Sequence, residues 1–227
     1  IHGVQAMNDT IIREYVFEKL NFEQGLRAQN IMISVENGIV TLSGRVRTYC
    51  EKYLAEQATK NVRGVKAVVE ELVVDVDAPL QRSDKEIAAA VVQALEADVS
   101  LMPPEKIKVV VENGKVELTG EVDEFYKKQQ AFECVKNLYG VTNVFNYVVV
   151  NSAAKAIDPK NVTHQIVREF QRNAVLDAKS IEVAIDGSKV ILRGIVRSWA
   201  EEKEARKAAW SVPGVTEVKD ELVLHIC

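Results

Sequence analysis

The chain has 227 residues, of which 47% are hydrophobic and 27% are charged, a balance typical of a globular protein. Its 29 lysines and arginines are outnumbered by 33 aspartates and glutamates, and the formal net charge is −4. Binding to DNA or RNA requires a cationic face that neutralises phosphates, so neither is an expected partner. No run of about 18 apolar residues occurs, so no transmembrane segment is expected.

The start of the chain bears on its compartment. Residues 1–6 (IHGVQA) lack the charged start and the apolar core of a signal peptide, and Met7 follows them directly. We therefore expect Met7 to be the natural start and the protein to be cytoplasmic. The alternative is a mature chain whose signal has been trimmed, which would be periplasmic. The three cysteines, Cys50, Cys134 and Cys227, form no CxxC pair, which predicts no disulfide framework and fits a reducing compartment.

The sequence repeats one unit three times. A twelve-residue block, first seen as VENGIVTLSGRV, covers Val35–Val46, Val111–Val122 and Ile185–Val196. The period is 76 and then 74 residues, longer than the roughly 20 to 50 residues of solenoid repeats, which cannot bury a core alone. Each copy is therefore expected to be a small domain, with boundaries at 7–76, 83–150 and 158–227.

Each copy opens with a predicted amphipathic helix. Apolar residues recur every fourth position and so share one helix face: Ile12, Val16 and Leu20; Ile87, Val91 and Leu95; Val162, Ile166 and Phe170. Start signals agree, because Ser83 with Glu86 forms a capping-box pattern and Asp158 precedes Pro159.

A β-hairpin is predicted next, because apolar residues alternate on both sides of a turn. Asn37-Gly38 and Asn113-Gly114 are typical two-residue hairpin turns. In the third copy, Asp186-Gly187-Ser188 is expected to lengthen the turn by one residue. Glycine inside the return strand predicts a close backbone approach, which we attribute to a packed helix, at Gly44, Gly120 and Gly194.

A second helix and a third strand complete each copy. Thr48 with Glu51, and Ser198 with Glu201, are capping boxes. Glycines suited to the residue beyond a helix C-terminus follow at Gly64, Gly140 and Gly214. A right-handed crossover would set the third strand parallel to the second. The predicted fold class is α+β, with three tandem α-β-β-α-β domains, each a three-stranded mixed sheet covered by two helices.

The block V-x-N-G-x-V-x-L-x-G-x-V, the alanine-containing helix and the following G-V-x-x-V resemble the BON domain, named for bacterial osmotically inducible and nodulation proteins. The resemblance covers three copies, nearly the whole chain from Met7 onward. It implies structural glycines at Gly44, Gly120 and Gly194, binding to phospholipid surfaces or envelope components under osmotic or envelope stress, and no enzymatic activity.

Neither a catalytic constellation nor a cofactor site is expected. His164 and His225 fall in different elements, no metal-ligand spacing occurs, and the glycines near the hairpin lack the Walker lysine and the dinucleotide spacing. We therefore predict that the protein is not an enzyme and that it holds neither a metal nor a cofactor.

One set of aromatic residues is a candidate binding site. An aromatic residue opens the second helix of every copy, at Tyr49, Phe125 and Trp199. Cations stand beside these rings, namely Arg47, Arg197, Lys127 and Lys128. A ring with neighbouring cations suits a lipid headgroup interface. The alternative is that these rings pack against the end of the sheet.

The first helix of the third copy carries a second candidate. Arg168 and Arg172 lie on successive turns together with His164, a row that could meet anionic lipid. The alternative is an ordinary solvated helix face.

The expected function is that of a non-enzymatic binding protein that contacts anionic phospholipid or an envelope protein during stress. The alternative is a soluble scaffold for protein partners, including self-association. A small-ligand carrier or an enzyme with a site at a domain junction has the least support.

Overall fold

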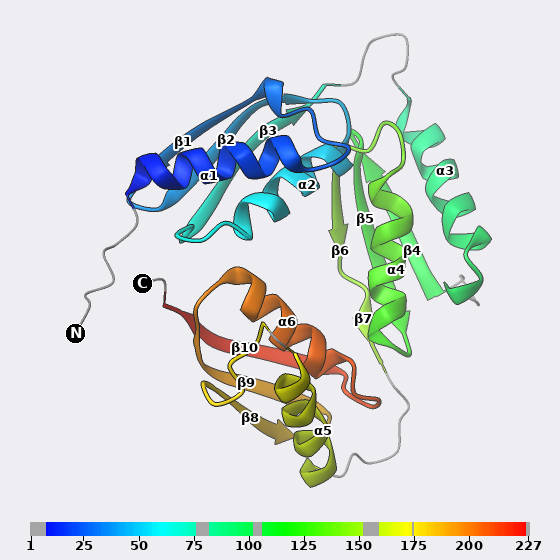
Figure 1. Ribbon diagram of the computed structural model, residues 1–227. Helices are drawn as coiled ribbons and strands as arrows, with labels where there is room; N and C mark the ends of the chain where they lie inside the picture. The colour runs from blue at the N-terminus through cyan, green and yellow to red at the C-terminus, as the bar shows by residue number, and fades with distance from the viewer. Residues whose placement is uncertain (1–7, 76–81, 102–105, 152–158, 174, 226–227) are drawn as a thin grey trace. The chain divides into compact units, whose positions relative to one another are not determined.

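The computed structural model describes residues 8–75, 82–101, 106–151, 159–173 and 175–225. Met7 and Cys227 lie outside the described residues, and so do the predicted domain limits at residues 7, 76, 158 and 227. Apart from residues 123–125, the described chain up to Val149 belongs to one compact unit, and the third domain belongs to another. Three α+β domains follow one another along the chain, as predicted (Figure 1).

The same element order occurs in each domain. The first domain contains α1 (Asp9–Phe22), β1 (Ile31–Glu36), β2 (Ile39–Val46), α2 (Tyr49–Lys60) and β3 (Ala67–Val74), with a short 3-10 helix at Ala28–Asn30. The second contains α3 (Asp84–Ala97), β4 (Ile107–Glu112), β5 (Lys115–Val122), α4 (Phe125–Lys136), β6 (Asn143–Asn146) and β7 (Val149–Val150), with a short 3-10 helix at Val99–Leu101. The third contains α5 (Pro159–Arg172), β8 (Ile181–Asp186), β9 (Lys189–Val196), α6 (Trp199–Trp210) and β10 (Glu217–Leu224).

The predicted strand arrangement is confirmed. In the first domain β1 pairs antiparallel with β2, and β3 runs parallel to β2 on its other side. The third domain repeats this order with β8, β9 and β10. Both helices of a domain lie on the same face of its sheet, as Figure 1 shows for α1 and α2. The crossover through the second helix is what allows β2 and β3 to be parallel.

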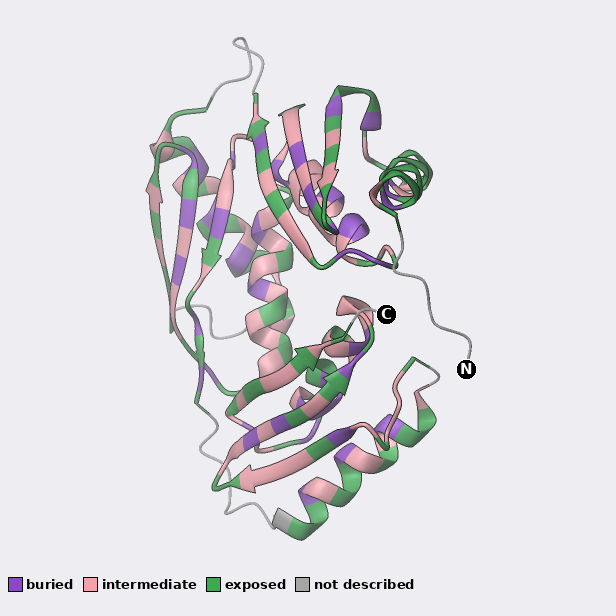
Figure 2. Ribbon diagram, turned by 90° about the vertical axis from the view of Figure 1, so that its left-hand side faces the viewer, coloured by how far each residue is buried: buried purple, intermediate pink, exposed green. Residues whose placement is uncertain are grey.

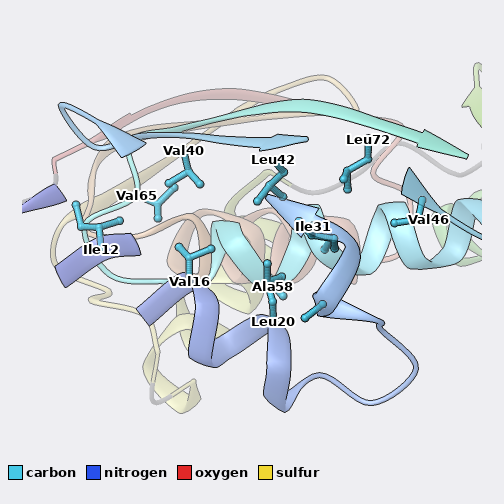
Figure 3. Close-up of a cluster of buried hydrophobic side chains, with 12 residues drawn as sticks. Ile12, Val16, Leu20, Ile31, Val40, Leu42, Val46, Ala58, Val65 and Leu72 are labelled. Atoms are coloured by element: carbon cyan, nitrogen blue, oxygen red, sulfur yellow. The ribbon is translucent and has the colours of Figure 1, made fainter. Parts of the chain in front are cut away.

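A separate apolar core fills the space between the helices and the sheet of the first and third domains. The helix residues predicted to share one face, such as Ile12, Val16 and Leu20, point toward strand residues that include Val40 and Leu42 (Figure 3). Burial alternates along the strands, as Figure 2 shows in colour. The period of two in the strands and the spacing of four in the helices therefore bury the residues expected from the sequence.

The predicted longer turn in the third domain is wrong. Asp186 pairs with Lys189, so Gly187 and Ser188 alone form the turn, which has the same length as Asn37-Gly38. The turn conformation differs instead. Both Asn37 and Gly38 have positive φ angles, whereas in the third domain only Gly187 does, which is the pattern of a type II′ rather than a type I′ turn.

The strand glycines are close to backbone, but the predicted neighbour is wrong. Gly44, Gly120 and Gly194 have φ angles of 124°, 124° and 126°. A Cβ added there would overlap the carbonyl oxygen of the residue just before the first strand, namely Asn30, Lys106 and Ser180, and not an atom of either α-helix. The backbone next to the first strand therefore leaves no room for a side chain. The positive φ angle is a separate reason why these positions favour glycine.

The third strand of the second domain is interrupted, although the sequence predicted one strand there. Between β6 and β7, the Asn146 side chain donates to the Lys128 carbonyl at 2.7 Å and accepts from the Val148 backbone at 3.2 Å. Side chains can compete with strand hydrogen bonds in this way, but the bond to residue i+2 does not by itself interrupt a strand. The equivalent Glu70 and Asp220 accept from Leu72 at 2.6 Å and from Leu222 at 3.0 Å, within unbroken strands.

Candidate ligand-binding surface

The three repeated aromatics occupy the first position of the second helix in each domain, as predicted. Thr48 caps α2 by accepting from the Glu51 backbone at 3.2 Å, and Ser198 caps α6 by accepting from Glu201 at 3.1 Å. The rings differ in exposure. Tyr49 is buried at 8% exposure, whereas Phe125 and Trp199 are half-buried.

The burial of Tyr49 comes from the neighbouring domain. Its ring meets the Phe132 ring edge-on, with centroids 6.3 Å apart and an interplanar angle of 80°. Desolvation, followed by the nearby Glu56 carboxylate, raises the pKa of the Tyr49 phenol to about 12, against a backbone hydrogen bond at Val144 that lowers it. This ring faces protein, so the first copy of the predicted aromatic site does not present it to a ligand.

Three of the four cations beside the aromatics, Arg197, Lys127 and Lys128, have a protein partner or are partly buried. The Arg197 guanidinium lies 2.8 Å from the Asp177 carboxylate. Burial lowers the pKa of Lys128, and Lys127 beside it is half-buried. The exposed Arg47 lines a shallow depression of about 570 Å³ beside Met32 and other residues of the first domain's sheet edge. The structure therefore does not reproduce one aromatic–cation patch in three copies.

Helix α5 carries the second predicted set on its outer side. Its inner side buries Val162, Ile166 and Phe170. Residues four apart form an exposed row of basic and imidazole side chains on the opposite face: Lys160, His164, Arg168 and Arg172. Arg172 is ion-paired with Glu169 at 2.6 Å, yet its side chain remains 70% exposed. The row therefore presents cationic groups to solvent along about three turns.

An apolar depression borders this row. It has a volume of about 450 Å³ and is lined by Lys160, Thr163, His164, Val167 and Ile185. Sequence reasoning found His164, Arg168 and Arg172 but missed Lys160, Val167 and Ile185. Ile185 belongs to β8, so only the fold brings it beside α5. A cationic row beside an apolar hollow matches a ligand with an anionic head and an apolar body.

The open sheet face of the third domain is a weaker cationic candidate than α5. Its basic residues are ion-paired: Lys189 with Glu217 and Arg193 with Glu221 at 2.7 Å across β9 and β10, and Lys219 with Glu221 within β10. These pairs neutralise the charge that an anionic ligand would require. The basic side chains of α5 are therefore a better candidate for binding an anionic ligand than those of this sheet face.

No group of three or more His, Cys, Asp and Glu side chains is placed to hold a metal ion within residues 8–75, 82–101, 106–151, 159–173 and 175–225. None of the helices seen in those same ranges is both long and apolar enough to cross a membrane.

Comparison with known proteins identifies the repeated unit. The model of the BON domain matches residues 8–75, 83–152 and 158–225. Osmotically-inducible protein Y of Escherichia coli is 27% identical over 144 residues, which cover 62% of this chain and 71% of that protein.

Solved structures give much weaker matches. A structure of CdsD, a structural protein of the type III secretion system of Chlamydia trachomatis, covers 96% of this chain and 93% of its own at 14% identity and a TM-score of 0.26. The PrgH periplasmic domain covers 87% and 96% at 9% identity and a TM-score of 0.21. Scores this low support no conclusion about this chain.

Proposed function

Because the chain belongs to the BON domain family through three tandem copies, we propose that it is a non-enzymatic binding protein that contacts anionic phospholipid surfaces through α5. The observation that carries the proposal is the exposed row of Lys160, His164, Arg168 and Arg172 beside the apolar depression. Each basic residue near an anionic membrane contributes about 1 kcal/mol of attraction.

The relative in Escherichia coli is named as osmotically inducible. We propose by extension that the present chain acts in osmotic or envelope stress. This role fits a protein that binds a membrane surface and catalyses no reaction. The depression explains how apolar contact would add to the charge, since burying each methylene of a lipid contributes about 0.8 kcal/mol.

Flotation with liposomes of phosphatidylcholine alone and with added phosphatidylglycerol tests the proposal. We expect binding only with the anionic lipid, weakening as salt rises. Reversing two charges, in Arg168→Glu/Arg172→Glu, should weaken binding roughly thirtyfold or more. The matched control is Lys179→Glu/Lys207→Glu, which makes the same change in net charge at two exposed lysines of the same domain outside the row. Equal weakening by both pairs would contradict a site on α5.

A protein scaffold is the second candidate. It is favoured by three exposed apolar side chains that lie within one narrow stripe of α1, namely Ile11, Tyr15 and Phe22, at 41%, 47% and 84% exposure. The second and third copies have no such stripe at the equivalent positions of their first helices. Liposome binding that is indifferent to lipid charge and to both pairs of substitutions, combined with concentration-dependent sedimentation abolished by Tyr15→Ser, would favour this candidate.

A further inference from the structure

The first two domains touch through two aromatic residues on α2 and one on α4. Tyr53 packs on Phe132 with centroids 5.2 Å apart at 60°, beside the Tyr49–Phe132 contact. The Lys136 ammonium lies 5.1 Å from the centre of the Tyr53 ring. We call Tyr49, Tyr53, Phe132 and Lys136 the aromatic clasp. Each aromatic pair contributes about 0.5 to 1.5 kcal/mol beyond its buried area.

The clasp is separate from the core of either domain. Tyr49 is buried, but the core cluster of the first domain does not contain it. Phe132 is half-exposed, whereas the neighbouring Ala131 and Val135 of the same helix are fully buried. Phe132 therefore lies on the flank of α4 and would be more exposed if the first domain were absent.

From this geometry we infer that the aromatic clasp joins the first and second domains into one body, and that Tyr49 serves as an anchor for the second domain and not as a ligand-binding residue. The inference is independent of the α5 surface, which lies in the third domain. It assigns the helix-opening aromatic of the first copy to a contact within the chain.

The pKa values at the clasp reflect its burial. Desolvation raises the pKa of the Tyr49 phenol to about 12, in line with the 8% exposure of this side chain. Burial also raises the pKa of the adjacent Cys50 thiol, with Lys136 of α4 acting in the opposite direction. Cys50 belongs to the first domain, yet charged side chains of α4 act on its pKa. It therefore lies close enough to the contact for its reaction rate to change when the contact is lost.

Amide hydrogen exchange of the full chain, read by mass spectrometry, tests the clasp. Truncating the ring on the second domain, in Phe132→Ala, should speed exchange along α2 of the first domain by about tenfold, because fraying of α2 is no longer opposed by the contact. The reaction rate of Cys50 with N-ethylmaleimide should rise by a similar factor. Tyr126→Ala is the matched control, since it removes an exposed ring from a different side of α4 and should change neither rate.

Unchanged exchange in α2 together with an unchanged Cys50 rate in Phe132→Ala would overturn the inference. If Phe132→Ala instead speeds exchange throughout β4 and β5, the second domain has lost its fold. Tyr53→Ala, which truncates the contact on the first domain, then tests the inference. Tyr53→Ala should speed exchange in α4, and no change there would also overturn the inference. In the double variant Phe132→Ala/Tyr53→Ala, the reaction rate of Cys50 should rise no more than in the single variant with the larger rise. A rise equal to the product of the two single rises would contradict a shared contact.

Discussion

The Asp9 carboxylate accepts a backbone hydrogen bond of 2.8 Å from Gly38, twenty-nine residues away in the hairpin turn. Its other oxygen accepts from Asn37 at 2.8 Å. Asp84 binds Asn113 and Gly114 of the second domain in the same way, at 2.8 and 2.9 Å. The first residue of each first helix thus fixes the hairpin turn in two domains. The third domain has Pro159 at this position, and its turn has the other conformation.

Replacing Asp9 with alanine should lower the free energy of unfolding of the first domain by about 1 to 2 kcal/mol. Two charge-assisted hydrogen bonds are lost, although partial solvent exposure reduces their value. Urea denaturation followed by hydrogen exchange of β1 and β2 measures the effect. Glu14→Ala, an exposed carboxylate on the same helix, is the control and should cost less than about 0.5 kcal/mol. Equal effects of the two substitutions would show that the turn contacts do not stabilise the domain.

Gly120→Ala should destabilise the second domain by at least about 3 kcal/mol. The added methyl group would overlap the Lys106 carbonyl oxygen, which belongs to backbone that cannot move independently of the strand, and the φ angle of 124° is also unfavourable for alanine. Gly187→Ala separates the two causes, because its Cβ would meet no atom within 4 Å. That control should cost only about 1 to 2 kcal/mol of backbone strain in the third domain. Similar losses in thermal unfolding would remove the steric explanation.

The sequence predicted the fold well because the signals that define it are local. Apolar spacing, caps and turn residues act within a few positions of one another, and three copies report the same pattern. The length of the turn in the third copy was mispredicted, although Gly187-Ser188, with glycine first, is itself a local signal for a two-residue type II′ turn. The role of the strand glycines was found, but their neighbour, a carbonyl brought in by strand pairing, was not.

The binding surface could be predicted only in part. His164, Arg168 and Arg172 were found because helical spacing alone places them in one row. Tyr49 could not be assigned, since its burial comes from Phe132 in another copy, and no pattern within a copy contains that contact. The pairing of Arg197 with Asp177 was likewise hidden, because a loop brings them together from 20 residues apart.

Glu201→Ala should cost the third domain about 2 to 4 kcal/mol. This carboxylate is only 4% exposed and accepts from the backbones of Asp177 at 2.9 Å and Arg197 at 2.7 Å. Its loss would leave two backbone N–H groups without their acceptor. The equivalent Glu51 accepts from Arg47 at 3.1 Å in a more exposed setting, and Glu51→Ala should cost about 1 kcal/mol in the first domain. Denaturant midpoints of the two variants test this order, and a larger loss for Glu51→Ala would contradict it.

Acid should reveal a contribution of Asp98 to the stability of the second domain. Hydrogen bonds from the Ser100 side chain, the Gln130 amide and the Ser100 backbone lower the pKa of this carboxyl from 3.8 to about 2. A lowered carboxyl pKa stabilises the folded state at pH values above the unfolded pKa, and the contribution is lost as the pH falls through about 4 to 2.

Asp98→Asn should therefore be less stable than the wild type at pH 7, and the difference should shrink as the pH falls through about 4 to 2. Urea midpoints measured across this range give the difference directly. Ser100→Ala removes the largest of the three interactions and should raise the pKa of Asp98, which carboxyl titration by NMR can follow. A constant difference between Asp98→Asn and wild type from pH 7 to pH 2 would mean that the ionised carboxylate contributes nothing beyond its shape, because only the charge is lost on titration.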